Sequence, residues 1–194
     1  SGYVAAVGWM LNSGGVGSSF ALSNSSATAW ESKVTANSFL YVACVGVTVA
    51  AVPTVLMDNV SFVAAASVLT AYVARQSLAA AGVSLSSVAA KTWSFSHLFV
   101  SVTRGSQVIA TVGTTNSLIL YRTAAAAGLA AFSGQDLVGA FHDITIAVSG
   151  SAVNAEFGRP VPSQGGLLSA AGVVMRVQRD ASINTSNIVV VVTD

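Results

Sequence analysis

The sequence contains very few charged residues. Of its 194 residues, 8 are Lys or Arg and 7 are Asp or Glu, whereas 53% are hydrophobic. Charged side chains make up about 25% of a typical soluble domain, and a net charge of +1 gives little repulsion between copies. The composition therefore indicates either a membrane protein or a protein whose surface is largely covered by other protein.

Cysteine is also nearly absent. The single cysteine, Cys44, excludes an internal disulfide and lies in the apolar run Val42-Ala43-Cys44-Val45, so we expect a buried small side chain. A lone thiol suits folding in a reducing cytoplasm. The chain begins Ser1-Gly2 without a basic segment before an apolar stretch, which favours a trimmed initiator methionine over a signal peptide, with proteolytic processing as the alternative.

One long uncharged run raises the membrane alternative. Residues 39–57 are 19 mostly apolar residues, close to the length of about 20 that a spanning helix needs. Pro53 lies inside this run, which is rich in Val and Thr and poor in Leu, and no basic cluster flanks it. We therefore expect no membrane partner.

The periodicity of the apolar residues favours strands. Alternation with a period of two recurs in residues 39–49, 97–103, 143–149 and 173–179, and glycine-containing breaks separate the segments. Both faces of 39–49 are apolar, so that strand should be buried on both sides. We detect no internal repeat. This pattern predicts an all-β fold, an antiparallel β-sandwich of jelly-roll type, as a single domain over residues 1–194. The Ala-rich segments 76–90 and 123–132 predict at most one or two short helices.

The chain ends in an unusual strand. Residues 187–193 are apolar on both faces and include five consecutive β-branched residues without charge or proline. A free edge of this kind invites uncontrolled pairing. We expect the segment to be covered on both faces and paired along its edges, within its own domain or by a neighbouring copy.

The two histidines are the natural candidates for catalysis. His142 precedes Asp143, but neighbours on a strand point to opposite faces, and no G-x-S-x-G nucleophile motif is present. We interpret His142 as a hydrogen-bonded side chain at a strand start. His97 belongs to the alternating set Trp93, Phe95, His97 and Phe99, which indicates core or interface packing, with a carbohydrate- or base-stacking platform as the alternative.

Other chemistry lacks its sequence signature. The seven carboxylates form no calcium loop, no Cys and His pair has zinc spacing, and no nucleotide-binding fingerprint occurs. No basic patch suits a nucleic acid. We predict no catalytic, cofactor-binding or metal site, no cofactor, no small-molecule substrate and no direct nucleic acid contact. The N-x-S/T sequons at Asn24, Asn59 and Asn184 matter only if the chain is secreted.

Residues 30–104 resemble a known module. The segments that carry this resemblance are 34–42 (VTANSFLYV), the polar turn 58–62 (DNVSF), and the strands 69–74 (LTAYVA) and 96–103 (SHLFVSVT). The segment is similar to a β-sandwich module of bacteriophage virion structural proteins and secreted bacterial surface proteins. The resemblance implies a structural or adhesive role without catalytic residues.

Together these observations predict a non-enzymatic structural subunit of a virion, a bacteriophage capsid, decoration or tail component, assembled in the host cytoplasm. Its partners would be copies of itself and other virion proteins, which meet through charge-poor surfaces without desolvating charges. The first alternative is a secreted or cell-surface filament or adhesin subunit that assembles by strand addition. The second is a carbohydrate-binding β-sandwich module.

Overall fold

The computed structural model of the chain describes residues 3–12, 17–74, 77–87, 91–113, 122–157, 166–177 and 179–194. Within these residues the chain forms fourteen β-strands and no helix. They follow one another in four groups of three and a final pair: β1 (Tyr3–Asn12), β2 (Ser19–Trp30), β3 (Lys33–Ser38); β4 (Tyr41–Ala50), β5 (Thr54–Ala65), β6 (Val68–Val73); β7 (Ser77–Ser87), β8 (Lys91–Thr103), β9 (Gln107–Val112); β10 (Arg122–Ser133), β11 (Leu137–Ser149), β12 (Ala152–Phe157); and β13 (Gly166–Val177), β14 (Ala181–Thr193).

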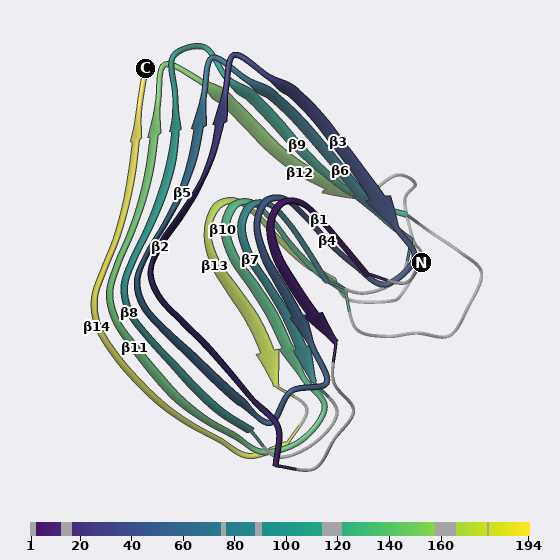
Figure 1. Ribbon diagram of the computed structural model, residues 1–194, viewed down its shortest axis with the longest axis vertical. Helices are drawn as coiled ribbons and strands as arrows, with labels where there is room; N and C mark the ends of the chain where they lie inside the picture. The colour runs from purple at the N-terminus through teal and green to yellow at the C-terminus, as the bar shows by residue number, and fades with distance from the viewer. Residues whose placement is uncertain are drawn as a thin grey trace.

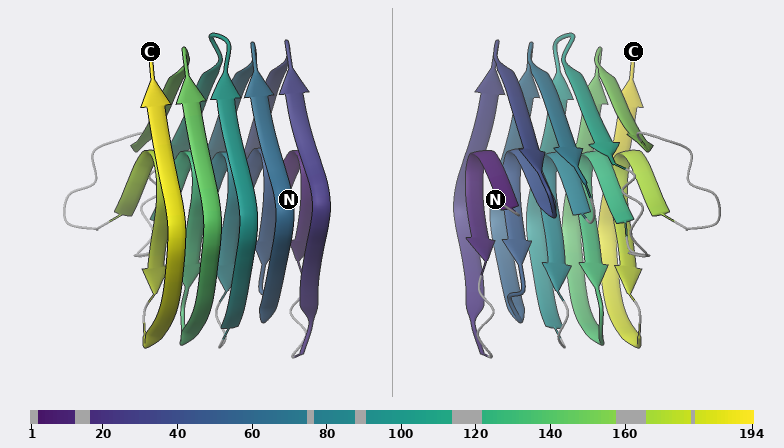
Figure 2. Two further views of the ribbon diagram at one scale, coloured as in Figure 1. Left: turned by 90° about the vertical axis from the view of Figure 1, so that its left-hand side faces the viewer. Right: turned by 90° about the vertical axis from the view of Figure 1, so that its right-hand side faces the viewer.

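Each strand pairs with the strand three positions along the chain, and every pairing is parallel. The result is three sheets: sheet A in the order β1-β4-β7-β10-β13, sheet B in the order β14-β11-β8-β5-β2, and sheet C in the order β12-β9-β6-β3. Figure 1 shows the chain winding through the three sheets in turn, and Figure 2 shows the coils stacked side by side with the two termini at opposite ends. This architecture is a parallel β-solenoid.

The predicted antiparallel jelly-roll sandwich is therefore wrong, although the all-β composition is right. Alternation of apolar residues reports which face of a strand is buried and does not report the direction of its neighbours. Residues 30–104, which carry the resemblance to a β-sandwich module, run from the end of β2 through β8 and form parallel strands in all three sheets.

The two Ala-rich segments considered for short helices form strands instead, and residues 76 and 88–90 of the first lie outside the described residues. Residues 77–87 and 122–133 form β7 and β10, and residues 78–86 and 123–133 are buried throughout. Sheet A folds into a tight arch between sheets B and C (Figure 1), so its strands pack on both faces and small side chains are required there. Tertiary packing in this arch overrides the helix propensity of alanine.

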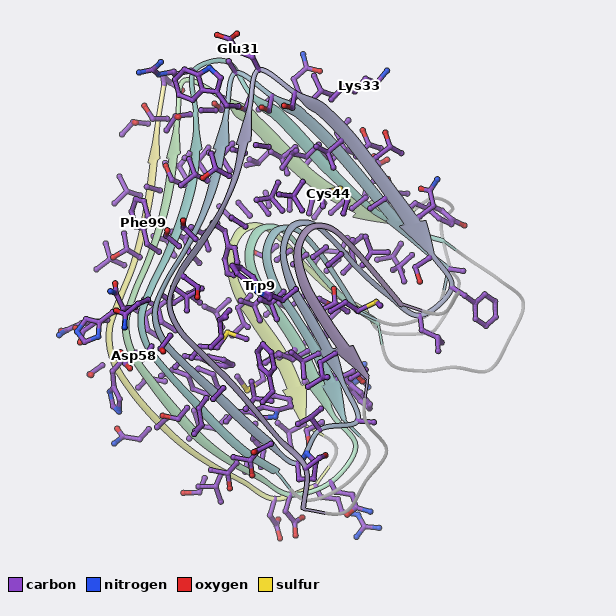
Figure 3. All side chains as sticks on the ribbon, viewed as in Figure 1. Trp9, Glu31, Lys33, Cys44, Asp58 and Phe99 are labelled. Atoms are coloured by element: carbon purple, nitrogen blue, oxygen red, sulfur yellow. The ribbon has the colours of Figure 1, made fainter. Side chains whose placement is uncertain are left out.

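The core lies between the arch of sheet A and the inner faces of sheets B and C. Residues 42–50 are all buried, as the two apolar faces of this segment predict. Cys44 is fully buried between sheets A and C (Figure 3), and burial raises the pKa of its thiol to about 12, which makes it a packing residue as expected. None of the described residues form a helix with the length and apolarity to span a membrane.

A repeat that the sequence analysis missed underlies the coils. Gly8, Gly46, Gly82, Gly128 and Gly172 stand beside one another in sheet A, each with a φ between 127° and 155°. A Cβ added to any of the first four would lie 1.7–2.0 Å from the carbonyl oxygen of the next glycine in the row, so only glycine fits. The spacing varies from 36 residues (Gly46 to Gly82) to 46 (Gly82 to Gly128), which hides the period from a search at fixed length.

A serine marks the turn from sheet B to sheet C in each of the first four coils. The backbone N–H of Ser32 donates to Ser67 Oγ at 3.2 Å, Ser67 N–H to Ser106 Oγ at 3.1 Å, and Ser106 N–H to Ser151 Oγ at 3.1 Å. Each hydroxyl also donates to a backbone carbonyl just before its own turn. These bonds satisfy polar groups at a corner where the sheet hydrogen bonds are interrupted, and they hold successive coils in register.

Among the described residues, nothing covers the last strand. β14 pairs with β11 along one edge, and every residue of β14 is exposed. The side chains from Ile188 to Val192 are each 38–62% exposed. The described residues of this chain therefore do not cover the segment, and its coverage by a neighbouring copy stays a prediction.

Candidate functional site

The outer face of sheet B carries a row of polar residues at matching positions in successive strands. Each long strand of this sheet bends at one residue whose φ is near +50°. The five bend residues lie side by side in the sheet: Asn24, Asn59, His97, Asp143 and Asn187. Left-handed backbone disfavours most side chains and is several-fold enriched in Asn, Asp and His. The bend itself therefore explains the residue types in this row.

The bend also interrupts the alternation of faces. The side chain of the bend residue and that of the residue just before it both point outward. Two polar rows therefore lie side by side on the outer face. We call these two rows together the polar band. The row before the bend consists of Ser23, Asp58, Ser96, His142 and Ser186. Figure 3 shows Asp58 projecting from the outer side of sheet B at this bend.

Hydrogen bonds run along the polar band from coil to coil. Asn59 Nδ2 donates to Asn24 Oδ1 at 2.7 Å, and Asn187 Nδ2 donates to Asp143 Oδ1 at 2.8 Å. Between them, His97 lies 3.1 Å from Asp58 through Nδ1 and 3.7 Å from Asp143 through Nε2. The side-chain amide hydrogen bonds at both ends of the band point the same way, because in each of them the later coil donates to the earlier one.

The charges of the band are centred on Asp58. The hydrogen bond from Ser96 Oγ, at 2.7 Å, and then the one from His97 hold the pKa of this carboxyl below its ordinary value of 3.8. Hydrogen bonds to a carboxylate favour its ionised form. The carboxyl is fully exposed, so this arrangement organises the surface and contributes little to the stability of the fold.

Replacing Ser96 with Ala should raise the pKa of Asp58 toward 3.8, because the largest cause of its depression is removed. A depressed carboxyl pKa stabilises the folded state above the ordinary value, and this contribution is lost as the pH falls through the depressed pKa. The variant should therefore lose less stability than the unmodified chain on acidification. Carboxyl-carbon NMR titration measures the pKa, with Ser94→Ala on the same face as the control. An unchanged Asp58 pKa in Ser96→Ala would show that the hydroxyl does not hold the carboxylate.

The structure places His142 and Asp143 differently from the sequence expectation. They do not lie on opposite faces, because Asp143 is the bend residue and both belong to the polar band. His142 is hydrogen-bonded, through Nδ1 to Ser186 Oγ at 2.7 Å, but it lies in the middle of β11 and not at a strand start.

The aromatic set around His97 is divided by the same bend. Trp93 and Phe95 point into the core, where Phe95 packs at 5.3 Å from the ring of Phe141, as the packing interpretation predicts. His97 and Phe99 lie outside, and Phe99 is 40% exposed. The four side chains thus form no continuous aromatic platform for sugars or bases.

An open groove of about 280 Å³ lies beside the polar band, lined by Leu56, Asp58 and Ser94 among others. In the part of the chain that the structure describes, no three His, Cys, Asp or Glu side chains are close enough to hold a metal ion. The Asn residues of the band were missed by the sequence analysis. Their signal was a recurring polar residue eight or nine residues before each turn serine.

Comparison of the chain with family models, with curated proteins and with solved structures gives no match.

Proposed function

We propose that the protein is a non-enzymatic structural subunit of a fibrous assembly built from copies of this chain. The observation that carries this proposal is the state of the two end strands of sheet B. Among the described residues β2 and β14 each pair on one edge only, and neither contains a charge or a proline. Natural proteins usually protect free edge strands with charges, prolines or bulges, so edges left open over 12 and 13 residues suit a partner strand.

The construction of the coils supports a mechanical role. The glycine row and the polar band recur in all five coils and the turn serines in the first four, so neighbouring coils meet through similar contacts along the solenoid. Solenoids of this kind derive their stability from contacts between adjacent repeats and extend without a limit set by a closed core. We therefore expect chains of this sequence to form a rod.

Two biological settings fit a rod. The scarcity of charge and the single thiol favour a virion component, of which a tail or fibre suits an elongated shape best. A secreted or cell-surface filament is favoured by a different observation, because the sequon residues Asn24, Asn59 and Asn184 are all exposed on sheet B. Mass spectrometry of the protein from its natural source, with and without glycosidase treatment, separates the two settings.

The proposal predicts concentration-dependent self-association. Sedimentation velocity over a range of concentrations at low salt should show a series of linear oligomers, because burial of the exposed apolar residues of β14 drives association. Negative-stain electron microscopy of the same samples should show rods of constant width. A protein that remains a monodisperse monomer at high concentration would contradict the proposal.

A further inference from the structure

We propose that copies of this chain stack head to tail, with β2 of one copy pairing in parallel beside β14 of the next and β1 pairing beside β13. Asn24 of one copy would then stand beside Asn187 of its neighbour, and Gly8 beside Gly172. This inference rests on the proposed function and specifies the surface, the partner and the register. We infer that a second copy covers the last coil, because the first coil of that copy brings Gly8 to Gly172 and Asn24 to Asn187.

The glycine row gives the steric argument. Gly8, Gly46, Gly82 and Gly128 each lie against the backbone of the following coil. Gly172 has the same unusual φ, +144°, but no backbone atom lies within 4 Å of the position of an added Cβ. The last coil therefore has the shape that accepts another coil, and Gly8 is the residue that the first coil of a second copy brings to this place.

The polar band gives the electrostatic argument. Asn187 Nδ2 donates to Asp143, which leaves Asn187 Oδ1 as an acceptor at the end of the row. Asn24 Oδ1 accepts from Asn59, which leaves Asn24 Nδ2 as a donor at the other end. Since each later coil donates to the earlier one, Asn24 of an added copy would donate to Asn187 in the direction that the row already follows.

The apolar residues at the two ends are also complementary. In the proposed register Val190 stands beside Ala27 and Val192 beside Ala29, so apolar side chains of β14 extend the inner face of sheet B. At the other end of the solenoid, half-buried side chains such as Phe20 and Leu22 lie against the core and would be covered by the added coil. Sheet C ends one strand earlier, at β12, so the contact is confined to sheets A and B.

A disulfide between the paired strands tests the register. Ser26 and Val189 both lie two residues after a bend residue, are exposed, and would stand beside each other across the contact. Neighbouring strands are about 4.8 Å apart, which is within the Cα–Cα range of a disulfide. The chain with both Ser26→Cys and Val189→Cys should form a ladder of covalent multimers on mild oxidation, seen by non-reducing electrophoresis. The buried Cys44 does not compete.

The control pairs Ser26→Cys with Val138→Cys. Val138 is 57% exposed but lies on β11, one strand away from the edge, so this chain should give no ladder. Two results would overturn the proposed register and leave the structural function standing. One is a ladder of multimers from the control chain as well. The other is the absence of a ladder from the test chain although it still forms oligomers. If neither chain associates in sedimentation, both the register and the function are wrong, and the exposed strand belongs to a different partner.

Discussion

Gly82→Ala is expected to remove about 4 kcal/mol or more of folding free energy, an effect at the upper end for a single substitution. The added Cβ would lie 2.0 Å from the carbonyl oxygen of Gly128, and the backbone on both sides is fully buried. Its φ of +127° adds strain for any L side chain. Because neither coil can move without breaking a parallel ladder, the variant should fold poorly or melt well below the unmodified protein. Circular dichroism during heating measures this.

Gly172→Ala is the matched control for that result. Its φ of +144° imposes a similar backbone strain, but the added Cβ would meet only Ser169 Oγ, at 3.1 Å. The loss of folding free energy should be limited to the backbone strain, about 1–3 kcal/mol. A folded monomer should be recovered. Equal destabilisation by the two substitutions would mean that φ alone selects glycine and that the close approach of the coils is unimportant.

Val190→Lys is expected to abolish self-association and to leave the single chain folded. Val190 is 44% exposed in one copy, so a lysine there can extend its ammonium group into water. In the stacked arrangement β2 of the next copy would cover this position, and burying an unpaired charge costs several kcal/mol. Sedimentation should show monomers at concentrations at which the unmodified chain forms oligomers, with an unchanged circular dichroism spectrum.

Val138→Lys serves as the control for this experiment. Val138 is 57% exposed on the outer face of sheet B, on β11, whose two edges are already paired within the chain. This variant carries the same added charge and should still associate. If Val190→Lys assembles like the unmodified chain, β14 does not take part in the contact between copies.

The sequence predicts the strands better than it predicts their arrangement. Leu98, Val100 and Val102 are buried as their alternation requires, and the doubly apolar segment that contains Cys44 is buried on both faces. Alternation carries no information on strand direction, and the spacing of the row that includes Gly46 and Gly82 is irregular. The recurring polar residue before each turn serine was the sequence signal that distinguishes a solenoid from a sandwich, and the unequal coil lengths obscure it.

The polar band shows a second limit. His97 and His142 could be singled out by residue type, but their surroundings depend on strands that lie far apart in the sequence. Ser96 and His97 bind Asp58, and the interactions span 38 and 39 residues. Moreover, a single left-handed residue reverses the face of every residue that follows it, so Phe99 points outward while Phe95 points inward.

The uniform direction of the amide hydrogen bonds has a consequence for growth kinetics. A fibre formed by the proposed stacking has no two-fold axis perpendicular to its length, since all coils run the same way. One tip exposes amide donors and half-buried aromatic residues, and the other exposes amide acceptors and the valine-rich strand β14. The two tips would bind incoming subunits at different rates. A small molecule or protein domain that binds only the β14 tip would thus arrest elongation there while the opposite tip continued to grow.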